Sequence, residues 1–91
     1  MSTYTDAQQY ALAIARACAA ETEAAPATDR VADLVVETIN RHGSAGLVCL
    51  ALALGRDLAD AYTLLAHKQG EPVEELLDRM AVAQLDDGEE V

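Results

Sequence analysis

The chain has neither Phe nor Trp, and its only aromatic residues are three Tyr among 91 residues. A core must therefore be built from Ala, Leu, Val and Ile, whose small side chains allow helices to pack closely. The same shortage leaves little aromatic surface on which a base or a flat ligand could stack. For a chain of this length we expect one modest aliphatic core in a single domain, residues 1–85.

Basic residues are also scarce, because one Lys and five Arg are set against 16 Asp and Glu, for a formal net charge of −10. Affinity for DNA or RNA comes largely from Lys and Arg placed on phosphates, so we expect no direct nucleic-acid binding. An anionic membrane surface is disfavoured for the same reason. The acidity favours a well-solvated surface or a basic protein partner.

Only two cysteines are present, Cys18 and Cys49, and with His42 and His67 they lack the local pairs that mark a zinc site. Two cysteines far apart in the sequence are also too few for a disulfide framework. The first six residues lack the basic and apolar segments of a secretory signal. We therefore expect a reduced, cytoplasmic protein with no metal ion.

What the chain does contain is an unbroken apolar stretch, residues 47–54, with the sequence LVCLALAL. In a helix this stretch leaves no polar face for two turns, so it has to be covered on every side. It is too short to cross a bilayer, which needs about 20 apolar residues. It predicts the buried centre of a helical domain or of a subunit interface.

Turn-forming residues divide the chain into four predicted helices. Thr5 and Gln8 have the form of a capping box at the start of the first helix, and Pro26 prevents this helix from continuing. Gly43 supplies a left-handed residue at a second helix end, and Pro72 suits the start of the last helix. The predicted helices span residues 6–23, 29–42, 44–70 and 72–85, and an acidic tail, residues 86–91, is expected to be disordered.

Short connections favour antiparallel neighbours, so we expect a small all-α four-helix bundle in which three shorter helices surround the long apolar third one. That helix is apolar on more than one face, which leaves part of it free to meet a second copy. We expect a homodimer, with a self-covered monomer as the alternative. The predicted self-association residues are Leu47, Val48, Leu52, Leu54, Leu58 and Tyr62.

A stripe of acids follows the predicted second helix. Asp29, Asp33 and Glu37 are spaced by four residues and therefore share one face. Such a stripe is either a solvated face or a docking surface for a basic partner.

Residues 42–46, HGSAG, approach the Gly-x-Ser-x-Gly nucleophile elbow, but His replaces the first Gly and no strand precedes it. Helix capping accounts for Gly43 and Ser44 instead. No Glu-x-x-His pair suits a di-iron site, and no general base stands beside a nucleophile. We expect no catalytic activity and no cofactor.

Ser44 carries a partial resemblance to acyl carrier proteins, which are small, acidic and four-helical and bear phosphopantetheine on a Ser that opens an apolar helix. The resemblance implies that Ser44 is the candidate cofactor-bearing residue. The chain departs from that family, because Gly43-Ser44-Ala45 replaces Asp-Ser-Leu and a predicted helix replaces the long loop.

These patterns predict a non-enzymatic acidic helical protein that acts through protein–protein contacts, as a regulator or adaptor that self-associates through residues 44–70. One alternative is an antitoxin, an immunity protein or a phage inhibitor whose acidic face neutralises a basic site. The other is an acyl-carrier-like protein modified at Ser44. The preference for Arg over Lys and the abundance of Ala favour a GC-rich genome, bacterial or phage.

Overall fold

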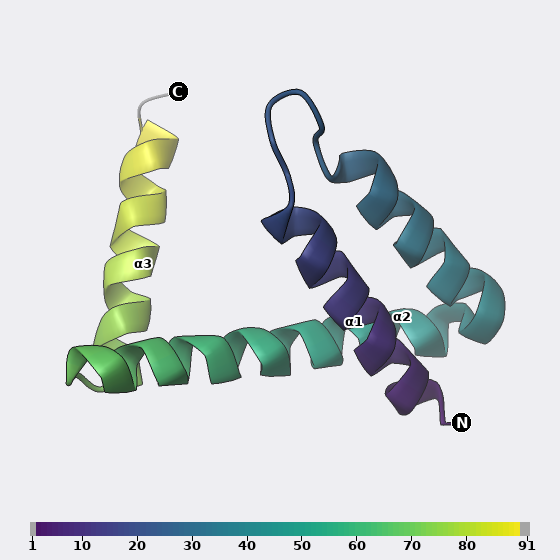
Figure 1. Ribbon diagram of the computed structural model, residues 1–91. Coiled ribbons are helices and arrows are strands. Elements are labelled where there is room, and N and C mark those ends of the chain that lie inside the picture. Colours follow the sequence, from purple (N-terminus) through teal and green to yellow (C-terminus); the bar gives the residue numbers. More distant parts are fainter. Residues whose placement is uncertain (1, 90–91) are drawn as a thin grey trace. The chain divides into compact units, whose positions relative to one another are not determined.

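The computed structural model describes residues 2–89, with side chains from residue 2 to residue 85, and all regular structure in this part of the chain is helical (Figure 1). The helices are α1 (Thr3–Ala19), α2 (Thr28–Gln69) and α3 (Val73–Glu89). The prediction of an all-α protein is confirmed. The four-helix bundle is not confirmed, because the chain divides into two compact units, Met1–Arg56 and Asp57–Val91.

Helix α2 is broken at Gly43, where the backbone has φ 66° and ψ −153°. This combination is essentially restricted to glycine, because a Cβ would clash with the backbone. The predicted positive φ is therefore observed, but the observed ψ of −153° differs from the value near +47° of the left-handed helical conformation expected at a helix end. The result is two arms that meet at a sharp bend, the first arm (residues 28–42) and the second arm (residues 44–69) (Figure 1).

Helix α1 begins and ends earlier than the sequence predicts. Ser2, in an extended conformation, caps the helix by accepting a hydrogen bond from the Thr5 backbone N–H, so the predicted cap at Thr5 is wrong by about one turn. The helix stops at Ala19 rather than near residue 23, because Glu21 and Thr22 bind loop amides instead. The Glu21 carboxylate accepts from the Ala27 N–H at 2.8 Å, which closes the loop before α2.

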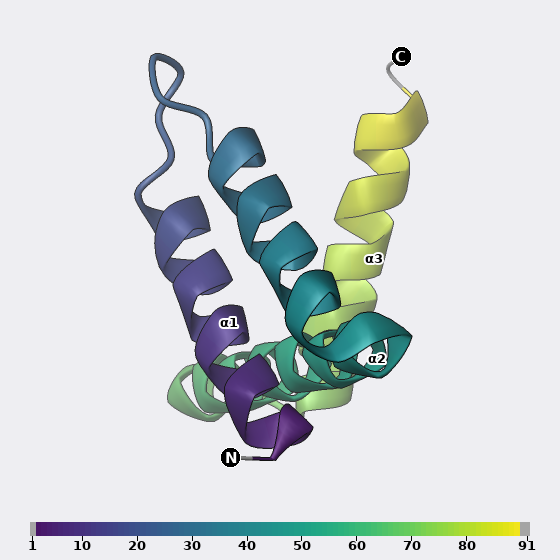
Figure 2. The same ribbon diagram turned by 90° about the vertical axis from the view of Figure 1, so that its right-hand side faces the viewer.

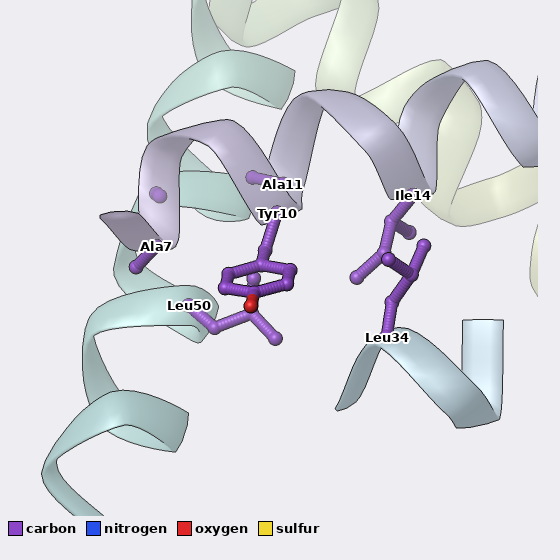
Figure 3. Packing of buried hydrophobic residues seen from close by; sticks show 7 residues of the cluster. Ala7, Tyr10, Ala11, Ile14, Leu34 and Leu50 are labelled. Atoms are coloured by element: carbon purple, nitrogen blue, oxygen red, sulfur yellow. The ribbon is translucent and has the colours of Figure 1, made fainter. Parts of the chain in front are cut away.

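In the first unit, α1 packs against both arms of α2 (Figure 2). Its core is aliphatic apart from one tyrosine, as the composition requires. Tyr10 lies beside Leu50, and Ile14 lies beside Leu34 (Figure 3). The buried cluster consists of Ala7, Tyr10, Ala11, Ile14, Leu34, Leu50 and Ala53.

Gly46 allows the second arm to turn back closely on the first. A Cβ at this position would lie 2.6 Å from the His42 Cβ and 3.0 Å from the Thr38 carbonyl oxygen. Thr38 is itself fully buried and donates its hydroxyl hydrogen to the Leu34 carbonyl at 2.8 Å. The bend at Gly43 and the missing side chain at Gly46 therefore act together to bring the arms into contact.

The second unit joins the rest of α2 to α3 and has a smaller core. Ala66 and Leu76 are its buried hydrophobic residues among the described side chains. An ion pair between Arg79 and Glu71 lies close to the turn, and Arg79 also reaches Gln69. Helix α3 continues to Glu89, beyond the predicted end at residue 85, and the rest of the predicted tail, residues 90–91, lies outside the described residues.

The apolar stretch 47–54 is covered on one side only. Leu50 and Ala53 are buried, whereas Leu47, Val48 and Leu52 are exposed. Helix α1 and the first arm reach only one face, so a single chain does not cover this stretch on every side. Its predicted burial in a subunit interface stays a prediction. No helix in the described part of the chain combines the length and apolarity that crossing a bilayer requires.

Candidate interaction surface

Exposed hydrophobic side chains gather on the second arm of α2. Of the large hydrophobic residues that are exposed among the described side chains, half lie on this arm, and Val48 is 68% exposed. Exposed apolar side chains that gather on one element commonly mark an interaction site. The six residues are Leu47, Val48, Leu52, Leu58, Leu64 and Leu65.

The sequence-predicted self-association residues fall into two groups. Leu47, Val48, Leu52 and Leu58 are exposed. Leu54 is partly buried because it packs against the core of the first unit, and Tyr62 is partly buried in the second unit. Four of the six therefore present between 43% and 68% of their surface to solvent, and the other two contribute to packing within the chain.

A regular seam runs along this arm, defined by Leu47, Ala51, Leu54, Leu58, Ala61 and Leu65. Successive members are four, three, four, three and four residues apart, which is the 3.5-residue period of a coiled-coil contact. The seam contains no charged residue. Of the six flanking positions that a coiled coil brings near its partner, only Asp57 is charged, whereas Val48, Leu50, Gly55, Tyr62 and Leu64 are not.

A cluster of polar side chains joins α1 to the first arm just before the bend. Asp6, only 8% exposed, accepts a hydrogen bond from His42 Nε2 at 2.7 Å, and Arg41 Nη1 lies 3.6 Å from the same carboxylate oxygen. The Thr3 hydroxyl lies 3.5 Å from the other ring nitrogen of His42. The cluster ties the end of the first arm to the first turns of α1.

Tyr10 and Glu37 extend this cluster along the two helices. The Tyr10 hydroxyl donates to Glu37 Oε1 at 3.0 Å, and Arg41 Nε lies 4.0 Å from that oxygen. Burial raises the pKa of the Tyr10 hydroxyl above its ordinary value, and the hydrogen bond to Glu37 raises this pKa further. Tyr10 therefore stays protonated and acts as a donor at neutral pH.

The hydrogen bond from His42 lowers the pKa of the Asp6 carboxyl below its ordinary value of 3.8, against the opposing effect of burial, and the charge of Arg41 lowers it further. A carboxyl with a lowered folded-state pKa stabilises the fold above its unfolded pKa, and this contribution is lost as the pH falls through the folded-state value. The Asp6 contribution is therefore complete at neutral pH and absent in strong acid.

We expect Asp6→Asn to lower the free energy of unfolding at pH 7, and we expect its difference from the natural chain to shrink between about pH 5 and about pH 2. Urea denaturation at a series of pH values measures this difference. Asp33→Asn, which removes an exposed carboxylate of the same unit, is the control and should change stability little at any of these pH values. A difference for Asp6→Asn that is constant with pH would contradict the role of the carboxylate charge.

A shallow cleft of about 280 Å³ opens beside this cluster and is lined by Asp6, Gln9, Tyr10, Ala13, Arg30, Leu34, Glu37 and Arg41. Four of these polar groups, Asp6, Tyr10, Glu37 and Arg41, pair with one another or with His42. The Thr3 hydroxyl and the His42 imidazole are not among the groups that line the cleft. We therefore interpret the cluster as a set of contacts that holds α1 against the first arm of α2. In the described residues, no group of three or more His, Cys, Asp or Glu is arranged to hold a metal ion.

One of the three residues of the predicted acidic face belongs to this cluster. Asp29, Asp33 and Glu37 are all exposed on the first arm, but Glu37 is engaged by Tyr10 and Arg41. Asp29 and Asp33 remain the part of the face that a basic partner could contact. Ser44 is also exposed, directly after the bend, and its modification by phosphopantetheine stays a prediction.

The Asp6–His42–Arg41 contacts were missed by sequence reasoning, which assigned His42 to a helix end and Asp6 to a first turn. Asp6 and His42 are 36 positions apart, and the packing of α1 against the first arm of α2 brings them together. By contrast, the seam leaves a signal in the sequence, because its period can be read without coordinates.

No family model, curated protein or solved structure matches this chain significantly. Function is therefore argued from the surface of the chain itself.

Proposed function

We propose that this chain is a non-enzymatic interaction protein that forms a homodimer through the seam of α2 and serves as a regulator or adaptor for other proteins. The observation that carries the proposal is the exposure of Leu47, Leu58 and Leu65 at coiled-coil spacing on one helix. Burying the exposed half of a leucine contributes about 1 kcal/mol, so several such residues together supply a substantial driving force.

The distribution of charge supports the same surface. A chain with a net charge of −10 repels its own copies over most of its exterior. The seam is a long strip without charge, so two copies can approach along it without burying a carboxylate. Depletion of charged residues is also what distinguishes the core of a protein interface from the remaining surface.

We propose a basic protein as the class of outside partner, with Asp29 and Asp33 as contact residues and the cytoplasm as its location. The exposure of these carboxylates on one face of the first arm supports this choice, as does the overall acidity. The seam and the acidic residues lie on different arms of α2, so a dimer would keep the acidic residues available.

Leu58→Glu tests self-association, because Leu58 is a seam residue that is 53% exposed and its replacement spares the core. Sedimentation velocity should show the natural chain as a dimer of 9.6-kDa subunits and the variant as a monomer, and circular dichroism should show the same helical content for both. We expect at least about a 100-fold weaker dimer, since a carboxylate buried at the seam costs several kcal/mol.

Leu12→Glu is the matched control, because Leu12 is 51% exposed on α1 and lies outside the seam. This variant should remain dimeric. A natural chain that is monomeric at every concentration measured, or a Leu58→Glu variant that dimerises as well as the natural chain, would overturn the proposal.

A further inference from the structure

The seam has the same order of residue types in both directions. Read forwards or backwards it is Leu, Ala, Leu, Leu, Ala, Leu. Residues 47 and 65, 51 and 61, and 54 and 58 are each equidistant from residue 56. Two copies that run in opposite directions about this point therefore match leucine with leucine and alanine with alanine along the whole seam.

We infer that two copies pair antiparallel along α2, with the two-fold axis beside residue 56, because the order of the seam residues permits this register and the unequal charge of the two halves of the chain favours it. This inference rests on the proposed self-association. Leu47 of one copy then lies against the partner subunit's Leu65, and Ala51 lies against the partner subunit's Ala61. Such an interface is isologous, the usual form of a symmetric dimer.

The net charge of each half of the chain favours this direction over the parallel one. Residues 1–56 carry six acids and four Arg, a net charge of −2, whereas residues 57–91 carry ten acids against Lys68 and Arg79, a net charge of −8. A parallel dimer places the two halves with a net charge of −8 beside each other. An antiparallel dimer places each −8 half beside a −2 half, which lowers the repulsion between copies.

Backbone features agree with the antiparallel arrangement. Oppositely directed helices bring the positive end of one helix dipole beside the negative end of the other. Gly55 flanks the seam next to the axis, and the space that its Cβ would occupy is empty. The helices can approach closely there, as they can at both alanine layers.

The geometry also meets the size that a dimer needs. The seam covers 19 residues, about 28 Å of helix, and two helices in contact over that length bury on the order of 1,000 Å² in total. This is the lower end for a specific interface. One unfavourable contact remains, because the two Asp57 carboxylates come near each other at the exposed edge of the axis, and such a pair costs only a few tenths of a kcal/mol.

Cysteine cross-linking tests the direction. In a background with Cys18→Ser and Cys49→Ala, single variants Ala51→Cys and Ala61→Cys are oxidised alone and as an equal mixture. Both variants keep every leucine of the seam. The antiparallel dimer predicts a disulfide between the two variants in the mixture at least tenfold faster than in either variant alone.

The outcomes separate this inference from the proposed function. If sedimentation shows dimers but Ala51→Cys alone cross-links as fast as the mixture, or if the mixture does not cross-link, the antiparallel arrangement is wrong and self-association stands. If sedimentation shows monomers throughout, self-association itself is wrong. A Leu12→Cys variant mixed with Ala61→Cys sets the background rate, because Leu12 lies outside the seam.

Discussion

Leu50→Ala is expected to lower the free energy of unfolding by about 2–5 kcal/mol, the range for removing a fully buried leucine. Leu50 is 2% exposed and lies in the second arm, where it packs beside Tyr10 of α1 (Figure 3). Its loss leaves a cavity where α1 meets α2. Small domains have only about 5–15 kcal/mol of stability in total, so the variant should be partly unfolded at physiological temperature.

Urea denaturation followed by circular dichroism measures this loss. Leu12→Ala is the control, because it removes the same atoms from a side chain of the same unit that is 51% exposed, and it should change the free energy of unfolding by no more than about 0.5 kcal/mol. Equal effects for the two variants would mean that the second arm does not pack on α1 as the structure has it.

Gly43→Ala is expected to lower the free energy of unfolding by about 1–3 kcal/mol, because the conformation at φ 66° and ψ −153° is strained for any residue with a Cβ. Apart from the adjoining backbone, no atom lies within 4 Å of the position where that Cβ would be, so the cost is local backbone strain and not a collision with the rest of the fold. Alanine also favours a helix that continues straight through the bend, which would separate the arms.

The matched comparison is Gly55→Ala, since Gly55 also has open space around its absent Cβ but lies inside a helix. This substitution should raise stability by about 0.5–1 kcal/mol. Both variants are best measured by urea denaturation in the Leu58→Glu background, so that changes in self-association do not contribute. A Gly43→Ala variant as stable as its parent would show that the bend is not required.

The bend, the polar cluster and the seam belong to one arrangement within the first unit. Gly43 turns the chain, Gly46 lets the arms meet, and His42 holds Asp6 on α1. With α1 held in this way, Leu50 and Ala53 are buried on one side of the second arm, while Val48 on the opposite side stays exposed, as does Leu47 at the edge of the buried side. The face proposed for the second copy is therefore set by the same contacts that build the core.

Local features could be predicted because their causes lie within a few residues. Gly43 ends the first arm since only glycine tolerates its conformation, and Pro72 directly precedes α3 because its fixed φ suits a helix start. Helix α1 was misplaced by one turn because Ser2 and Thr5 are equally good caps by residue type. Only the packing of the first turn, where Asp6 and Ala7 are buried, selects Ser2.

By itself, the sequence determined the helical class, the bend at Gly43, the acidic exterior and the periodic seam, because each depends on residue type and local spacing. The tertiary structure alone decided which side of the apolar stretch is covered and which polar groups meet. Periodicity shows that Val48 and Leu50 lie on different faces of a helix, but not which of them faces α1. The choice follows from the direction in which the chain leaves Gly43, whereas the pairing of Asp6 with His42 follows from the packing of α1 against the first arm.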